Sequence, residues 1–194
     1  MRIPFLGPVL GRLAGDERGV TAMEFGLILP ILVMFSAGTI EYSRLILLTQ
    51  KLQSGAFILA DLTARDQDLS TEQLSHIFLA IDQVVAPFRF VGEGRAIVSS
   101  VGADAADDPI LNWQCGGSGA LAVASQLGTE EGEPVALPDE LDLKHGETLI
   151  AAEVFYAFEP LFGVGLEPRT IRRVAYFKPR LGDLATMTCP DEEI

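Results

Sequence analysis

The chain has 194 residues, of which 48% are hydrophobic, yet its formal net charge is −13. These properties are compatible only if the apolar residues are concentrated in one part of the chain, and residues 25–40 indeed carry no charge. From residue 42 onward there are 11 Lys and Arg against 23 Asp and Glu. A surface this acidic repels nucleic acid. We therefore expect no nucleic-acid partner. The length accommodates one globular domain plus an anchor.

Residues 1–19 are rich in Gly and Pro and carry three Arg residues, which is typical of a leader peptide. From Val20 to about Arg65 the pattern is helical. Leucines at helical spacing mark the second half of this stretch: Leu45, Leu48, Leu52, Leu59 and Leu62. Pro30 lies inside it, and membrane helices tolerate the bend that a proline causes. We therefore expect one long helix over residues 20–65, embedded in lipid at its start and amphipathic afterwards.

Residues 66–194 are predicted to form an α+β domain outside the membrane. Ser70 and Gln73 fit a capping box, which starts a second amphipathic helix that Pro87 ends. Four later segments are rich in β-branched and aromatic residues and predict a small antiparallel sheet: residues 95–101, 110–115, 148–158 and 170–177. The connection over residues 116–146 is expected to be a mobile loop or to hold a short helix.

Cys115 and Cys189 are the only cysteines, and neither lies in a Cys-x-x-Cys motif. They are consistent with one disulfide in an oxidising compartment, and equally with two separate thiols. His76 and His145 have no metal-ligand spacing around them, so we expect no metal and no cofactor. The sequence holds no nucleophile–base pair and no phosphate-binding loop, so we expect no enzymatic activity and no small-molecule substrate.

Membrane geometry draws attention to Glu24. Residues 25–40 give about 24 Å of helix, whereas a span that begins at Val20 reaches about 31 Å, enough to cross a roughly 30 Å hydrocarbon core. The longer span places Glu24 in the hydrocarbon, where a lone carboxylate costs at least about 2.5 kcal/mol. Cleavage after Gly19 would free the amine of Val20, and the ammonium of a neighbouring subunit could then pair with Glu24.

A second interpretation needs no such pairing. Glu24 would lie at the membrane interface and reach water, and the span would run from Phe25 to Leu48. Glu41 and Arg44 would then be buried, and their spacing of three residues allows them to pair with each other. Helix geometry alone leaves both interpretations open.

A glycine, four residues, Glu24-Phe25 and an apolar helix together resemble the processing site of type IV prepilins and pseudopilins. More closely, residues 18–44, with Pro30 and Glu41, resemble the N-terminus of the TadE/TadG-like families, and of the TadE-like family above all. The resemblance implies a pseudopilin-like fold and a minor pseudopilin that helps to assemble the pilus of the tight-adherence (Flp) system, related to type IV secretion.

The same resemblance implies a location and a set of partners. The protein would cross the inner (cytoplasmic) membrane once, with its C-terminal domain extracytoplasmic, in the periplasm. A prepilin peptidase would cleave between Gly19 and Val20, and Glu24 with Phe25 would take part in helix pairing. Other pilin-like subunits and the pilus assembly platform would be the remaining partners.

One departure from the prepilin pattern concerns the leader. Asp16 and Glu17 precede Arg18, where prepilin leaders are usually rich in Lys and Arg. This leaves open an unprocessed anchor, as in TadG-like relatives, and an alternative function as a single-span binding or sensor domain with no pilus role. A basic cluster in the second half is expected to be a solvated strand face, with docking of an acidic pilus subunit as the alternative: Arg169, Arg172, Arg173, Lys178 and Arg180.

Overall fold

The computed structural model describes residues 18–67, 69–138 and 140–189. A very long helix, α2 (Arg18–Thr63), precedes α3 (Thr71–Val85) and the short α4 (Phe90–Glu93). Four antiparallel strands follow and pair in the order β2-β1-β3-β4. Their bounds are β1 (Gly94–Ala103), β2 (Pro109–Gly117), β3 (Thr148–Phe158) and β4 (Arg169–Phe177). The predicted α+β class, with its long helix, second helix and small antiparallel sheet, is confirmed.

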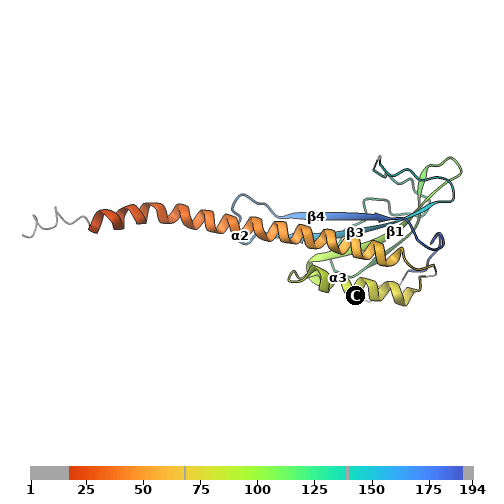
Figure 1. Ribbon diagram of the computed structural model, residues 1–194, viewed down its shortest axis with the longest axis horizontal. Coiled ribbons are helices and arrows are strands. Elements are labelled where there is room, and N and C mark those ends of the chain that lie inside the picture. The colour runs from red at the N-terminus through yellow and green to blue at the C-terminus, as the bar shows by residue number, and fades with distance from the viewer. Residues whose placement is uncertain (1–17, 68, 139, 190–194) are drawn as a thin grey trace, which may run out of the picture.

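Helix α2 extends far beyond the rest of the molecule (Figure 1). It is continuous over 46 residues, with Pro30 inside it, and ends two residues before the predicted Arg65. Residues 19–36 are exposed throughout, whereas Leu48, Leu52 and Leu59 are fully buried. The same helix therefore changes surroundings along its length, as its change from a continuous apolar run to an amphipathic pattern predicts.

The main core lies between the helices and one face of the sheet. Helix α3 begins with the predicted capping box, in which the Gln73 N–H donates to Ser70 Oγ at 3.2 Å and the Ser70 N–H donates to Gln73 Oε1 at 2.8 Å. Four of its side chains are buried against α2 and the sheet: Leu74, Phe78, Ile81 and Val85. Trp113 faces the same core, and its Nε1–H donates to the Leu184 carbonyl at 2.7 Å.

A second, smaller core covers the opposite face of the sheet, because alternate residues of a strand point to opposite faces. Leu149 and Ala151 of β3 pack there, while Ile150 and Ala152 face the main core. The connection over residues 116–146 holds no helix among its described residues and supplies three buried side chains to this face: Leu127, Val135 and Leu143. The expected short helix is therefore not found there, and a connection packed by its own leucines takes its place.

The buried carboxylate of Glu153 fixes this connection to the sheet. It accepts hydrogen bonds from Ser125 Oγ, from the Gln126 N–H at 3.2 Å and from Arg172 Nε at 2.6 Å. A buried charge is tolerated only when it is paired and hydrogen-bonded, and Glu153 meets both conditions.

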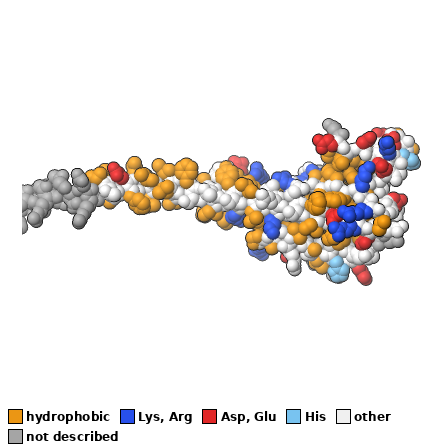
Figure 2. Space-filling view, in the orientation of Figure 1, with side chains coloured by type: hydrophobic (Ala, Val, Ile, Leu, Met, Phe, Trp, Pro, Cys, Tyr) orange, Lys and Arg blue, Asp and Glu red, His pale blue; other side chains and the backbone are white. Residues whose placement is uncertain are grey.

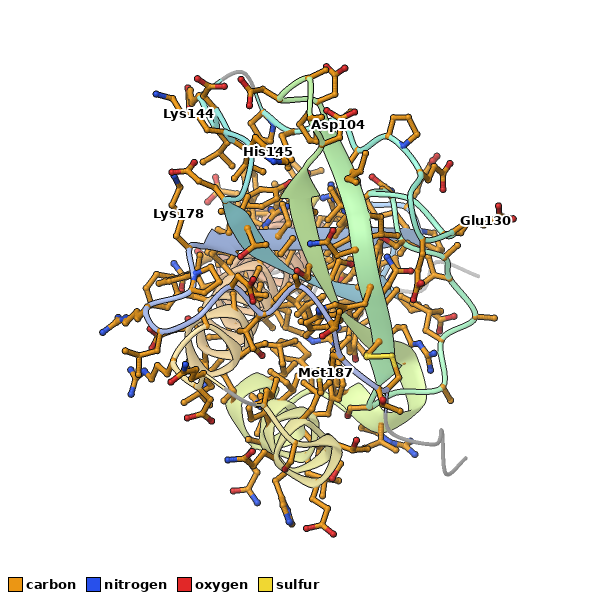
Figure 3. All side chains as sticks on the ribbon, turned by 90° about the vertical axis from the view of Figure 1, so that its right-hand side faces the viewer. Asp104, Glu130, Lys144, His145, Lys178 and Met187 are labelled. Atoms are coloured by element: carbon orange, nitrogen blue, oxygen red, sulfur yellow. A yellow bond between two sulfur atoms is a disulfide. The ribbon has the colours of Figure 1, made fainter. Side chains whose placement is uncertain are left out.

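Glu147, immediately before β3, makes contacts that favour its charged carboxylate. The hydrogen bond from Lys178 Nζ, at 3.0 Å, and that from the Lys144 N–H, at 3.2 Å, lower the pKa of the Glu147 carboxyl. Lys144 and Lys178 lie along one edge of the domain (Figure 3). A carboxyl whose pKa is lower in the folded state stabilises the protein above its unfolded pKa of about 4.3, and this contribution is lost as the pH falls through the folded value.

We therefore expect Glu147→Gln to lower the melting temperature at about pH 6 and to have little effect at about pH 3. The single Trp113 is buried and reports unfolding of the full chain in detergent by fluorescence. Glu131→Gln is the matched control, since Glu131 is exposed on the neighbouring connection. An equal loss of melting temperature at both pH values would contradict the proposed role of the Glu147 charge.

Candidate functional site

The exposed half of α2 is the first part of the candidate site. The helix over Gly19–Thr63 is long and apolar enough to cross a membrane. Apolar side chains cover this projecting rod, whereas the domain at its other end mixes apolar, acidic and basic side chains (Figure 2). Residues 19–36 are exposed with respect to the described part of the chain, so most of their apolar surface is available to lipid or to another helix.

The predicted processing and pairing residues all lie near the start of this helix. Gly19 and Val20 belong to its first turn, and residues 1–17 of the predicted leader lie outside the described residues. Val20 and Glu24 are four residues apart and therefore share a face of the helix. Glu24 and Phe25 are exposed, and within the described part of the chain the Glu24 carboxylate forms no hydrogen bond or ion pair. Its partner, if it has one, is not among the described residues.

Glu41 lies where the exposed half of α2 meets the domain, a place called the junction below. Its side chain is fully buried. Its carboxylate accepts hydrogen bonds from the Leu161 N–H at 2.9 Å and from the Phe162 N–H at 2.7 Å. Arg44 Nη1 is 3.8 Å from Glu41 Oε1, which is an ion pair but too long for a hydrogen bond. The spacing of Glu41 and Arg44 suggests their pairing, but no sequence signal indicates the two loop amides more than a hundred residues away.

The loop that supplies these amides joins β3 to β4 and comprises residues 159–168, here called the β3–β4 loop. It lies at the end of the sheet nearest the free half of α2 (Figure 1). Gly163 and Gly165 have φ of 66° and 72°, values that favour glycine and let the loop turn back on the helix. Tyr42 Oη donates to the Gly165 carbonyl at 3.5 Å. Between loop and helix lies an open hollow of about 450 Å³, lined by Met34, Phe35, Gly38, Thr39, Tyr42 and Val164.

Three members of the predicted basic cluster form ion pairs within the chain. Arg172 pairs with Glu153 at 2.6 Å, Lys178 with Glu147 at 3.0 Å, and Arg180 Nη2 with Asp61 at 3.0 Å. These cations stabilise the contacts of β3, β4 and α2 with one another, which leaves less of their charge for a partner than the docking interpretation assumed.

The histidines stand apart from each other and from this junction. His76 is exposed on α3, and His145 Nδ1 lies 3.0 Å from the Asp104 carbonyl oxygen in an exposed turn. Among the described residues, no group of three His, Cys, Asp or Glu side chains is placed to hold a metal ion.

Comparison with protein families identifies the anchor. Residues 19–60 match the model of the family described as TadE-like protein. Over these residues the helix that begins at Gly19 is similar to the TadE-like family. The match covers the exposed half of α2, the Glu41 junction and most of the buried half, and it ends three residues before α2 does. Searches of the curated proteins and of the solved structures returned no significant match.

Beyond the TadE-like helix, the structure joins Cys115 and Cys189 in a disulfide. Cys115 is a buried residue of β2, and Cys189 belongs to the segment that follows β4. The yellow S–S bond lies close to Met187 of that segment in Figure 3. The bond, together with the Leu184 carbonyl that accepts from Trp113, holds the segment across the end of the main core.

We expect both cysteines to resist labelling by a thiol reagent under denaturing, non-reducing conditions, and to label fully after reduction. Cutting the bond with Cys189→Ala should lower the free energy of unfolding by roughly 4 kcal/mol, because the closed loop spans 74 positions of sequence. The double variant Cys115→Ala, Cys189→Ala controls for the free thiol that the single variant leaves. Quantitative labelling of the unreduced protein would show that the two thiols are separate.

Proposed function

We propose that this protein is a minor, pseudopilin-like component of a tight-adherence pilus assembly system. The observation that carries this proposal is the coincidence of the TadE-like match with a helix whose first half is apolar and exposed with respect to the described residues. The helix anchors the protein in the inner membrane as a single span, and residues from about Tyr42 onward form an extracytoplasmic domain. The protein acts by helix contacts in the membrane and by domain contacts outside it, without catalysis.

Processing and pairing complete this proposal. A prepilin peptidase cleaves after Gly19, and the new amine of Val20 belongs to a subunit that packs beside another copy or another pilin-like subunit. The Glu24 carboxylate of one subunit then pairs with the Val20 ammonium of its neighbour. Support comes from two features of α2: Glu24 is exposed on an apolar helix, and the described chain offers it no cation. An unpaired acid inside lipid is costly, so a neighbour that supplies the charge stabilises the assembly.

The orientation is tested by a reporter. An alkaline phosphatase fused after Arg65 should be active, because the proposed topology places α2's C-terminal end outside the cytoplasm. A β-galactosidase fused at the same position, which is active only in the cytoplasm, should be inactive. Activity that follows the opposite pattern, in fusions shown by immunoblot to be stable, would reverse the topology.

The pairing is tested by Glu24→Ala and Gly19→Leu. Glu24→Ala should leave insertion and cleavage intact, since removing the carboxylate relieves a desolvation cost of about 2.5 kcal/mol or more. It should nevertheless abolish pilus assembly, because the Val20 ammonium of the neighbour loses its partner. Gly19→Leu acts one step earlier and should leave a longer, uncleaved protein with the same assembly defect.

Three measurements separate the outcomes: the size of the protein on a gel, the N-terminal mass of the membrane-extracted chain, and the number of pili per cell. Glu24→Gln keeps the size of the side chain and should behave as Glu24→Ala does if charge is what matters. Normal piliation in both Glu24 variants would eliminate the pairing. A mature chain that still carries residues 1–19 would favour an unprocessed anchor, and piliation unaffected by deletion of the protein would remove the pilus role.

A further inference from the structure

The β3–β4 loop carries an uncharged apolar tip on an otherwise acidic domain. Residues 160–166 contain no charged side chain, while Glu159, Glu167 and Arg169 flank them. Leu161 and Phe162 at the tip are 61% and 55% exposed. Exposure alone decides nothing, because isolated apolar side chains are common on protein surfaces and Leu79 on α3 is 66% exposed. The position of the tip relative to the anchor distinguishes it from these other residues.

The loop reaches back along α2 into the segment predicted to cross the membrane. Val164 Cγ1 lies beside Gly38, at 3.7 Å from where a Cβ atom on that glycine would stand, which is an ordinary van der Waals distance. Val164 also shares the lining of the open hollow with Met34 and Phe35. If the span covers residues 20–40, Phe35 lies about 7.5 Å below its end. Val164 shares a lining with Phe35, so this part of the loop comes within the roughly 5–10 Å to which interfacial elements insert their apolar side chains, while the backbone of Leu161 and Phe162 lies at the level of Glu41.

Irregular backbone does not survive in lipid with unpaired N–H groups, because each such group costs free energy. At the tip of the β3–β4 loop the N–H groups of Leu161 and Phe162 are paired, because both donate to the Glu41 carboxylate. Tyr42 covers the Gly165 carbonyl from the same helix. Tyrosine is a residue that favours the membrane interface, so its place at this level of α2 fits a lipid boundary.

We propose that the β3–β4 loop is a second membrane-contacting element, which inserts Leu161 and Phe162 into the leaflet beside the anchor helix. The hollow between Val164 and the helix then holds part of a lipid acyl chain. The acidic surface of the domain does not oppose this contact. The tip of the loop is uncharged, and α2 already holds the domain at the bilayer. Two contacts, the span and the loop, fix the tilt and rotation of the domain on the membrane.

The observations favour lipid over a protein partner as the occupant. Val164 of the loop shares an open hollow with Met34 and Phe35, so whatever solvates these helix side chains also meets the loop. The proposal rests on α2 crossing the membrane, and the experiment below therefore measures the span and the loop separately.

The full chain is reconstituted in phosphatidylcholine vesicles with a nitroxide label at one position at a time. The native cysteines are joined in the disulfide, so a single introduced cysteine is labelled selectively. Leu161→Cys and Phe162→Cys probe the loop, Leu79→Cys is an equally exposed control on the domain, and Leu27→Cys marks the span. Unchanged Trp113 fluorescence confirms that each variant is folded. Collision rates with oxygen, which partitions into lipid, and with a water-soluble nickel chelate report the surroundings of each label.

We expect the ratio of oxygen to nickel collisions at residues 161 and 162 to exceed that at residue 79 by severalfold and to approach that at residue 27. A ratio at the loop equal to that at residue 79 would place the tip in water and overturn the proposal. Labels at the loop that are shielded from both reagents would indicate a protein contact, which also overturns it. A nickel-dominated ratio at residue 27 would contradict the membrane span itself, and with it both the anchor and the loop contact.

Discussion

Helix α2 has to satisfy two environments with one uninterrupted backbone. A helix closes its own hydrogen bonds, so it crosses from lipid to water without exposing polar backbone groups, and only its side chains need to change. They do so at about Ala37, where the helix turns from fully exposed to partly buried. Beyond that point Leu48, Leu52 and Leu59 belong to the main core, so the sheet and α3 fold onto the anchor. The domain is consequently built on the same helix that is long and apolar enough to cross a membrane.

This arrangement gives the junction at Glu41 its importance. Without the β3–β4 loop, the domain would touch α2 only through the amphipathic half of the helix. The loop extends this contact toward the membrane, and a buried carboxylate bound to two amides is a directional link. Charge-assisted hydrogen bonds to a fixed backbone leave little freedom for the loop to move relative to the helix. The domain and the span are thereby connected at two levels of the same helix.

Local patterns in the sequence predicted much of the fold. The capping box at Ser70, the leucine spacing of α2 and the four β-rich segments each depend on neighbours within a few residues, and each was confirmed. The packed connection over residues 116–146 was not predicted, because its burial depends on Leu127, Val135 and Leu143, which are too widely spaced to form a continuous helix or strand pattern. The bonds from the β3–β4 loop to Glu41 were missed for a related reason. They join a helix and a hairpin that are far apart in sequence. The sequence around an acid next to an apolar run is the same whether its carboxylate faces water or accepts hydrogen bonds from amides.

The candidate site shows the same division. Glu24 could be singled out from the sequence, because the length of the span places it in the hydrocarbon, where a charge costs free energy. Glu41 could not be separated from an exposed acid at the end of a span, and its role depends on the hairpin fold. The basic cluster is the opposite case. Its sequence pattern suggested a docking surface, but Arg172, Lys178 and Arg180 form ion pairs with acids of the same chain.

Two acids bound the apolar stretch of α2, and the structure treats them differently. Glu24 and Glu41 are 17 residues apart, or about 26 Å along the helix, which is most of the thickness of a hydrocarbon core. The chain satisfies Glu41 itself, with two amides and the nearby Arg44. It offers Glu24 no such group among the described residues. An acid that is satisfied internally can hold a fold together, whereas one left unsatisfied in lipid favours association with a molecule that brings the missing charge. The junction acid therefore serves the protein's own architecture, whereas the proposed function assigns assembly to the acid near the start of the helix.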